Sequence, residues 1–234
     1  MNIIVTGCSQ GIGYEIVRYL IRSGNHKIIG VSRNTKPLKE LEKKGEKSFF
    51  KSIEYDINQL NMNYEVFIEE IKNYCESIDI LINNAGLLIK KDFQDFTSDD
   101  ILRIFNTNLF SPARLIKLLL PLMMKKANKA HIVNIGSMGG FQGSQKFPGL
   151  SWYSSSKAAL ANLTECLSLE LGKYNIALNC LALGSVETPM LSIAFPDYKP
   201  QVKADSIAKF ISDFALKGHE FFNGKIIPVA LSNP

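Results

Sequence analysis

The sequence predicts a single α/β domain with a doubly wound parallel sheet of about seven strands and helices on both faces. Short apolar runs typical of buried strands alternate with amphipathic runs typical of helices along all 234 residues. This alternation implies parallel strands joined by right-handed crossovers. No linker, repeat or low-complexity segment divides the chain, and its length suits one good core rather than two. We therefore expect 1–234 to form one domain.

The composition argues against several classes of protein. The chain is 46% hydrophobic and 21% charged with a net charge of +5, which is ordinary for a globular domain. Its lysine doublets are scattered, and we interpret them as solvated faces rather than a nucleic-acid footprint. The doublets are Lys43-Lys44, Lys90-Lys91 and Lys125-Lys126.

The cysteines and histidines indicate neither a disulfide framework nor a metal site. The cysteines lie far apart with no Cys-x-x-Cys pair, and each histidine is isolated. They are Cys8, Cys75, Cys166, Cys180, His26, His131 and His219.

No segment predicts membrane insertion or secretion. The first strand begins almost at Met1, without a charged region followed by an apolar one. The most apolar long stretch is 109–124, but Arg114 and Lys117 interrupt it, so a buried helix is favoured over a membrane span. We expect a soluble cytoplasmic protein with no membrane partner.

The first element is a strand over 2–6, followed by a glycine-rich turn over 7–13 and a helix over 14–23 that ends at Gly24. Glycines allow backbone N–H groups to approach a pyrophosphate, and the helix N-terminus favours its charge. A glycine-rich turn alone could be only a tight turn. Because a strand precedes it and a helix follows it, we favour nucleotide binding.

The second strand, 27–32, suggests which dinucleotide binds. In a dinucleotide fold the residue that contacts the adenosine ribose ends this strand, about 20 residues past the glycines. An acidic side chain there would select NAD(H), whereas this chain has Ser32-Arg33. Arginine suits a 2′-phosphate, so we predict NADP(H). The alternative is an arginine in a solvated loop.

The middle of the chain continues the alternation with a helix over 37–44, a strand over 48–55, a helix over 63–75 and a strand over 79–82. That last strand runs into the polar turn 83–86, at the sheet edge where open α/β sheets bind ligands. The remaining elements are a helix from 97 to about 126, a strand over 131–135, a long loop over 136–152, a helix from 153 to about 174, a strand over 176–183, an irregular segment over 184–203, a helix over 204–216 and a strand over 225–229.

Tyr153 and Lys157 form the chain's one Tyr-x-x-x-Lys pair, and their spacing places them on one helical face. A tyrosine pKa is ordinarily about 10. An ammonium at about 4 Å favours the phenolate by roughly 4 kcal/mol at an effective dielectric constant of about 20, enough to bring that pKa towards about 7. Since chance alone often produces such a pair, its weight depends on its surroundings.

With these residues in place, the chain resembles the short-chain dehydrogenase/reductase family over essentially its full length. The resemblance implies a Rossmann-like fold and hydride transfer between NADP(H) and a carbonyl or secondary alcohol. The matching residues are Thr6-Gly7-x-x-x-Gly11-Ile12-Gly13, Asp56, Asn83-Asn84-Ala85-Gly86, Asn108, Ser137, Tyr153-x-x-x-Lys157 and Thr188.

The resemblance implies a role for each catalytic residue. Tyr153 would donate a proton to the substrate oxygen, Lys157 would lower the tyrosine pKa and hold the nicotinamide ribose, and Ser137 would bind the same oxygen. Asn108 would hold a water that connects Lys157 to solvent, with Asn106 as a competing candidate. The implied cofactor-binding residues are Gly7, Ser9, Gly11, Ile12, Gly13, Arg33, Asp56, Ile57, Asn83, Ala85, Gly86, Tyr153, Lys157, Gly184, Val186 and Thr188.

Three departures from the family pattern bear on these roles. Leu183-Gly184 stands where the family usually has Pro-Gly, and Gln10 stands where many NADP-preferring members carry a base. Ser137 lies further from Tyr153 than usual, by about three residues within the 141–152 loop.

The expected substrate is a small molecule with a hydrophobic body, as for a carbonyl reductase or 3-oxoacyl reductase. A catalytically silent NADP-binding regulator is the alternative. The expected pocket residues, which could equally be core, are Met138, Phe141, Leu183, Val186 and Met190. We also expect a homodimer or homotetramer, because 109–124 and 158–171 show apolar residues over more than one face. These are Leu115, Leu118, Leu119, Leu122, Leu160, Leu163, Leu167 and Leu171.

Overall fold

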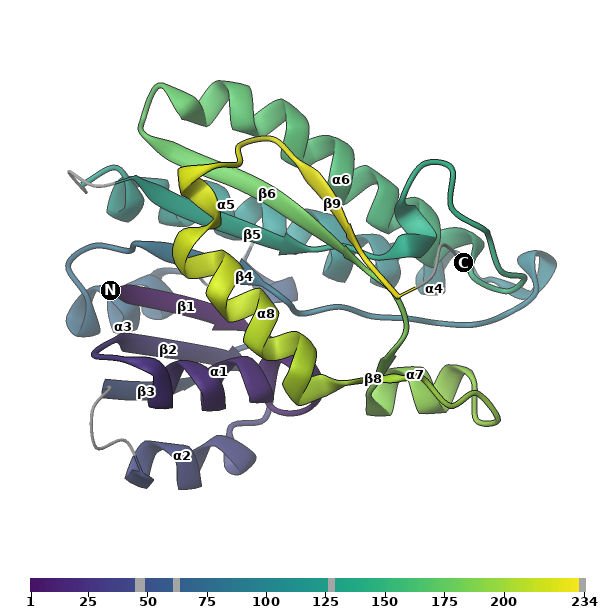
Figure 1. Ribbon diagram of the computed structural model, residues 1–234, viewed down its shortest axis with the longest axis horizontal. Coiled ribbons are helices and arrows are strands. Elements are labelled where there is room, and N and C mark those ends of the chain that lie inside the picture. Colours follow the sequence, from purple (N-terminus) through teal and green to yellow (C-terminus); the bar gives the residue numbers. More distant parts are fainter. Residues whose placement is uncertain (45–48, 61–63, 126–128, 232–234) are drawn as a thin grey trace.

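A parallel sheet forms the centre of the molecule, as the sequence predicts. The structure, a computed structural model, describes residues 1–44, 49–60, 64–125 and 129–231. In these residues seven strands pair in the order β3-β2-β1-β4-β5-β6-β9, and every pairing is parallel (Figure 1). The strands are β1 Asn2–Thr6, β2 Lys27–Ser32, β3 Phe49–Glu54, β4 Ile80–Asn83, β5 Ala130–Ile135, β6 Ile176–Leu183 and β9 Ile226–Val229.

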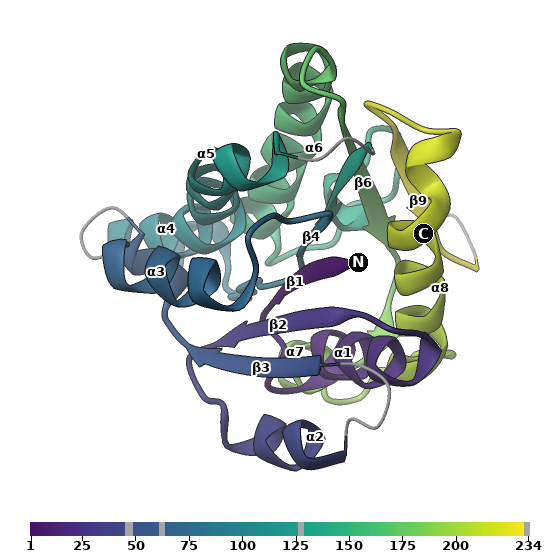
Figure 2. The same cartoon turned by 90° about the vertical axis from the view of Figure 1, so that its left-hand side faces the viewer.

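Helices cover both faces of this sheet (Figure 2). Successive strand residues point to opposite faces, so Ile3 and Val5 pack against α1 and α8, while Ile4 packs on the side of α3, α5 and α6. Burial on both faces explains why the strands read as continuous apolar runs. The helices are α1 Gly11–Ser23, α2 Lys39–Lys44, α3 Glu65–Tyr74, α4 Ser98–Phe105, α5 Ser111–Met123, α6 Ser151–Gly172, α7 Pro189–Ala194 and α8 Ala204–Lys217.

The helix expected from 97 to about 126 is interrupted. Its predicted start is confirmed by a capping box between Thr97 and Asp100. A π-helical turn over Asn106–Phe110 then separates α4 from α5. Pro112 has no N–H to donate to the carbonyl four residues earlier, which disfavours regular α-helical bonding there. The expected end at Lys126 lies outside the described residues, as do the expected starts at Ser48 and Asn63.

The segment 184–203 is more ordered than predicted. It contains two short paired strands, β7 Val186–Glu187 and β8 Val202–Lys203, with α7 between them. The Thr188 side chain accepts a hydrogen bond from the backbone N–H of Leu191 at 3.3 Å, and Pro189 occupies the first helical position. A capping threonine followed by proline is a helix-start signal that the sequence interpretation missed.

Most leucines expected to extend an intersubunit face are instead buried within the chain. Leu115, Leu119, Leu122, Leu160 and Leu171 are core residues, and Leu118, Leu163 and Leu167 are partly buried. The exposed apolar side chains of these helices and the π turn are different ones. They include Leu102, Phe110 and Leu169, which are 63%, 42% and 83% exposed.

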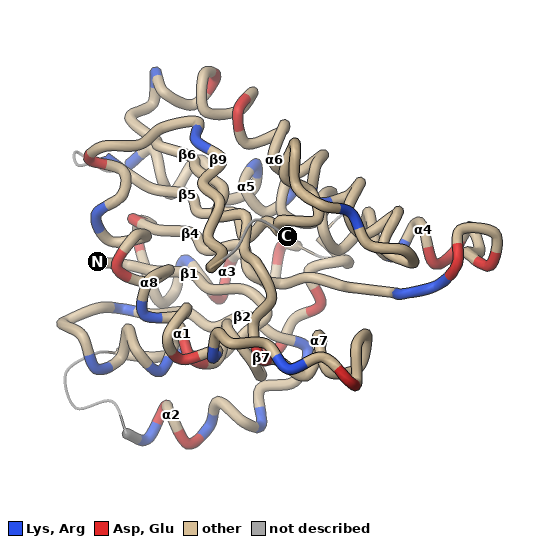
Figure 3. Tube along the Cα trace, turned by 45° about the vertical axis from the view of Figure 1, so that its right-hand side comes forward, with Lys and Arg blue, Asp and Glu red and all other residues tan. Residues whose placement is uncertain are grey.

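Basic and acidic residues are scattered over the surface elements (Figure 3). None of the helices in the described part of the chain combines the length and apolar character that a membrane crossing needs.

Candidate active site

The glycine loop lies at the carboxyl end of β1, and α1 already begins at Gly11 rather than at Tyr14 as expected. Gly7 and Gly11 have φ values of +68° and +58°, which favour glycine. A Cβ at Gly7 would lie 2.6 Å from the Cα of Ala85, and one at Gly13 would lie 2.5 Å from Asn84 Nδ2. The loop therefore fits closely against the turn after β4 and leaves the N-terminus of α1 for an anionic group.

Two residues that were not among the predicted catalytic or cofactor-binding residues, Thr6 and Asn84, hold this turn against the glycine loop. Asn84 Nδ2 donates to the carbonyl oxygens of Thr6 at 3.0 Å and Gly7 at 3.1 Å. Buried Thr6 Oγ1 accepts from the backbone N–H groups of Asn84 and Ala85, both at 3.1 Å. The predicted Asn83 instead directs its side chain to Asn134 Oδ1 at 2.8 Å, away from the loop.

Ser137 and Tyr153 lie near each other in the fold. Ser137 follows β5, and its Oγ accepts the backbone N–H of Gly139 at 3.1 Å, which leaves the hydroxyl proton for a hydrogen bond with the Tyr153 phenol. Tyr153 lies in the first turn of α6. A Cβ at Gly140 would lie 2.5 Å from the backbone nitrogen of Ala158, so glycine lets this loop lie directly on α6.

Lys157 lies one turn beyond Tyr153, but it does not lower the phenol pKa as the sequence interpretation expects. Its Nζ donates to the carbonyl oxygen of Ile135 at 2.8 Å. Burial lowers the pKa of Lys157 to about 8. Burial also raises the pKa of Tyr153, and the Ser137 hydrogen bond opposes this only in part. The expectation is corrected because the lysine side chain reaches across to β5.

Asn108 is fully buried in the π turn. Its Oδ1 accepts the N–H of Leu87 at 2.8 Å, and its Nδ2 donates to Leu87 O and Ser156 Oγ, both at 2.9 Å. Both amide protons are therefore used in joining the π turn to α6 and to the segment after Gly86. Asn106 faces elsewhere and accepts from Arg114 at 2.8 Å, so the competing candidate is not part of this cluster.

The segment after Gly86 lies close to both buried polar residues. A Cβ at Gly86 would lie 3.5 Å from Asn108 Oδ1 and 3.6 Å from Lys157 Nζ. The turn after β4 thus joins the glycine loop on one side to the Lys157 cluster on the other.

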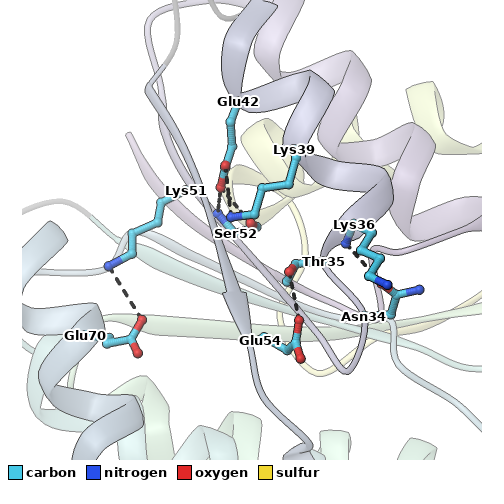
Figure 4. Close-up of polar contacts among 9 residues, drawn as sticks. All are labelled: Asn34, Thr35, Lys36, Lys39, Glu42, Lys51, Ser52, Glu54 and Glu70. Carbon is cyan, nitrogen blue, oxygen red and sulfur yellow. Dashed lines mark hydrogen bonds and ion pairs between the residues drawn. The ribbon is translucent and has the colours of Figure 1, made fainter.

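Arg33 lies at the carboxyl end of β2 and is exposed, whereas Ser32 is buried. Figure 4 shows how the turn that follows is fixed: Thr35 Oγ1 donates to Glu54 at 3.0 Å, and Asn34 Oδ1 accepts the N–H of Lys36 at 3.0 Å. The arginine therefore projects from an ordered turn at the sheet edge.

The other predicted contacts lie along the same edge of the sheet. Asp56 follows β3 and accepts the N–H of Asn58 at 3.0 Å, so it also acts as a turn former, and Ile57 is in the core. A Cβ at Gly11 would lie 3.5 Å from Thr188 Cγ2, which brings the segment after β6 next to the glycine loop. A Cβ at Gly184 would approach Ala230 to 2.8 Å.

Three of the five expected pocket residues are core residues instead. Met138, Leu183 and Val186 are 3%, 5% and 6% exposed. Phe141 is partly buried and Met190 is 37% exposed. The described residues contain no group of three or more His, Cys, Asp or Glu side chains that could hold a metal ion.

Comparison with known proteins shows which family the chain belongs to. The model of the short chain dehydrogenase family matches residues 1–199. A fatty acyl-CoA reductase of Acinetobacter baylyi is 32% identical over 87% of this chain and 70% of its own length. An NADP-dependent 3-hydroxy acid dehydrogenase of Schizosaccharomyces pombe is 31% identical over 89% and 79%.

A solved structure shows the same fold. A mutant 4-hydroxyisoleucine dehydrogenase complexed with NADH and succinate superposes with a TM-score of 0.86 at 22% identity, covering 98% of this chain and 97% of its own. The fold, the family model and the sequence relatives lead to one conclusion: the chain belongs to the short-chain dehydrogenase family and has its oxidoreductase fold.

Proposed function

We propose that the whole chain is one NADP(H)-binding domain that reduces a carbonyl group, or oxidises the matching secondary alcohol, on a small molecule with a hydrophobic body. The observation that carries this proposal is that Ser137, which follows β5, interacts with Tyr153 in the first turn of α6, with buried Lys157 one helical turn further on. A 3-oxoacyl type of substrate is supported by relatives named for fatty acyl-CoA and 3-hydroxy acid chemistry. No observation favours the silent regulator.

The residues present fit a nicotinamide dinucleotide. Close packing at Gly7 and Gly13 keeps side chains out of the loop, and the N-terminus of α1 favours a pyrophosphate. When bound, NADPH supplies the hydride. The proposed binding residues are Gly7, Ser9, Gly11, Ile12, Gly13, Arg33, Asp56, Ile57, Asn83, Ala85, Gly86, Tyr153, Lys157, Gly184, Val186 and Thr188.

Tyr153 acts as the acid in the reduction direction. Because burial raises its pKa, the phenol is protonated at neutral pH and has a proton to give to the substrate oxygen. Ser137 donates to the same oxygen and stabilises the charge that develops there. Lys157 contributes a cation and hydrogen-bond donors to the nicotinamide ribose, and Asn108 positions the segment after Gly86 through Leu87.

A substrate screen tests this function. NADPH absorbance is followed with ketones, aldehydes and 3-oxoacyl thioesters. We expect turnover with members that carry an apolar chain. Stoichiometric NADPH binding without turnover of any member would contradict the enzyme and favour the regulator.

Arg33→Ala is expected to remove most of a preference for NADPH over NADH. A charge-assisted contact with the 2′-phosphate contributes roughly 1.5–3 kcal/mol, or about one to two decades in affinity. Calorimetric titration of both cofactors measures the change. Arg22→Ala, an exposed arginine at the end of α1, is the matched control and should keep the preference. Equal affinities in the unmodified protein would contradict NADP selection.

A homodimer or homotetramer is expected in solution, formed with second copies of this chain through the exposed apolar side chains of α4, the π turn and α6. Light scattering at micromolar concentration measures the mass. Leu169→Glu should dissociate the assembly, whereas Val66→Glu, at an exposed position of α3, should not. A particle of monomer mass in the unmodified protein would rule the assembly out.

A further inference from the structure

The neighbouring residues Lys90 and Lys91, expected to be solvated alike, have different surroundings. Lys91 Nζ forms an ion pair with buried Asp100 at 2.5 Å, so its charge is neutralised. Lys90 Nζ lies 4.1 Å from the ring centroid of Phe195. Among the described ion pairs none includes Lys90. Lys90 is therefore a positioned cation whose charge is not neutralised by any carboxylate in the part of the chain that the structure describes.

The Lys90 side chain lies where three segments of the chain meet. Its stem packs at Gly149, where a Cβ would lie 3.0 Å from Lys90 Cγ, and the N–H of Lys91 donates to Gly149 O at 3.2 Å. Its ammonium group lies on Phe195, which directly follows α7. The segment after β4, the loop before α6 and the segment after α7 thus meet at one side chain.

The position of Lys90 along the chain sets which part of a substrate it can reach. Lys90 lies four positions after Gly86, which faces Lys157, and this segment is not helical. At about 3.3–3.6 Å per residue, the chain between them spans at most about 14 Å. Figure 1 shows this segment running away from the end of β4 towards α4, so Lys90 is placed to meet the end of a medium-length substrate that lies away from the reacting oxygen.

A cation held on an aromatic ring keeps its N–H donors for a stronger partner. Exposed cation–π contacts contribute about 0.5–1 kcal/mol, whereas hydrogen bonds to charged groups contribute about 1.5–3 kcal/mol. An anionic oxygen group would therefore replace Phe195 as the partner of Lys90.

We propose that Lys90 determines specificity by binding an anionic group, a carboxylate or phosphate, at the end of the substrate away from its carbonyl. This inference rests on the proposed reductase function. It assigns Lys90 to substrate selection rather than to proton or hydride transfer.

Matched substrate pairs test the assignment. The first pair is an oxo acid, which carries its ketone and its carboxylate at opposite ends, and the methyl ester of that acid. The ester lacks the negative charge, so this pair tests carboxylate binding. The second pair is a 3-oxoacyl-CoA and the N-acetylcysteamine thioester of the same acyl group. The latter lacks the phosphates of CoA, so this pair tests phosphate binding. For at least one pair we expect the unmodified enzyme to favour the anionic member by about threefold to tenfold in kcat/KM, mainly through KM. Lys90→Met should abolish the preference and Lys90→Arg should keep it.

Lys173→Met is the matched control, because Lys173 also lies over an aromatic ring, that of Tyr174 at 5.1 Å, but just beyond the opposite end of α6. It should leave the preference unchanged. Turnover without discrimination in both pairs, or a preference that persists in Lys90→Met, would overturn the role of Lys90 while leaving the proposed function intact. If no carbonyl is turned over, the proposed function fails, and calorimetric binding of the anionic ligands to unmodified protein and Lys90→Met decides the assignment.

Discussion

Replacing Tyr153 by phenylalanine is expected to lower kcat for carbonyl reduction by about a hundredfold to ten-thousandfold, the range for loss of a positioned acid. The change deletes one hydroxyl and keeps the ring, so the packing at the start of α6 is retained. Ser137 keeps its bond from Gly139 N, and Lys157 keeps its bond to Ile135 O. NADPH affinity should therefore stay within about threefold, because the binding groups remain in place.

Steady-state kinetics and calorimetric NADPH titration of Tyr153→Phe separate these two effects. Tyr174→Phe, at an exposed tyrosine just beyond the other end of α6, is the control and should leave both values unchanged. Rates near those of the unmodified enzyme would refute the assignment of the acid. Loss of both NADPH affinity and the circular dichroism of the folded protein would show that Tyr153 is structural.

Acidification is expected to destabilise the protein through His131, a fully buried residue of β5. Its Nδ1 faces the carbonyl oxygen of Ala215 at 2.9 Å, so this nitrogen carries the proton. Its Nε2 accepts from Asn179 Nδ2 at 3.0 Å, and Asn179 Oδ1 is held by the N–H of Lys225. A proton on Nε2 would face another donor, and the positive charge would be buried.

The direction of the effect follows from the two pKa values. The pKa of His131 is lowered from 6.5 to about 4, mainly by burial; the Ala215 hydrogen bond opposes this shift, and the nearby His219 and Lys129 contribute to it. Between pH 6.5 and about 4 the unfolded state therefore binds more protons than the native state. Above pH 6.5 protonation of His131 does not reduce the free energy of unfolding. As the pH approaches 4, this protonation lowers the free energy of unfolding by about 3 kcal/mol.

Urea unfolding at a series of pH values measures this loss. His131→Asn should be less stable at neutral pH, because a buried hydrogen bond is lost, but its unfolding free energy should depend less on pH. His26→Asn, at a less buried histidine, should keep most of the slope. A slope in His131→Asn equal to that of the unmodified protein would contradict the assignment.

Local patterns predict the fold well because the strands are buried on both faces. The apolar runs at β1 and β4 and the glycines at 7, 11 and 13 required no tertiary information. The π turn and α7 also have local causes, in Pro112 and in Thr188-Pro189. The order of strands and helices is therefore predicted from the sequence more reliably than local features such as the π turn and α7.

Features that depend on a partner far along the chain could not be predicted. The spacing of Tyr153 and Lys157 places them on one helical face, but it does not show that the ammonium reaches Ile135 O. Likewise, the sequence gives no reason for Lys91 to pair with Asp100 while Lys90 lies on Phe195. The burial of the α5 and α6 leucines depends on neighbours across the fold.

The central claim is that this chain transfers a hydride between NADPH and a carbonyl carbon with Tyr153 as the acid. The most direct measurement uses NADPH deuterated at the transferring position of its nicotinamide, together with mass spectrometry of the alcohol formed from a 3-oxoacyl thioester. We predict one deuterium on the new carbinol carbon with the unmodified protein, and product formation reduced to a small fraction with Tyr153→Phe. NADPH bound stoichiometrically with no deuterated alcohol from any carbonyl offered, or equal labelling by Tyr153→Phe, would contradict the account.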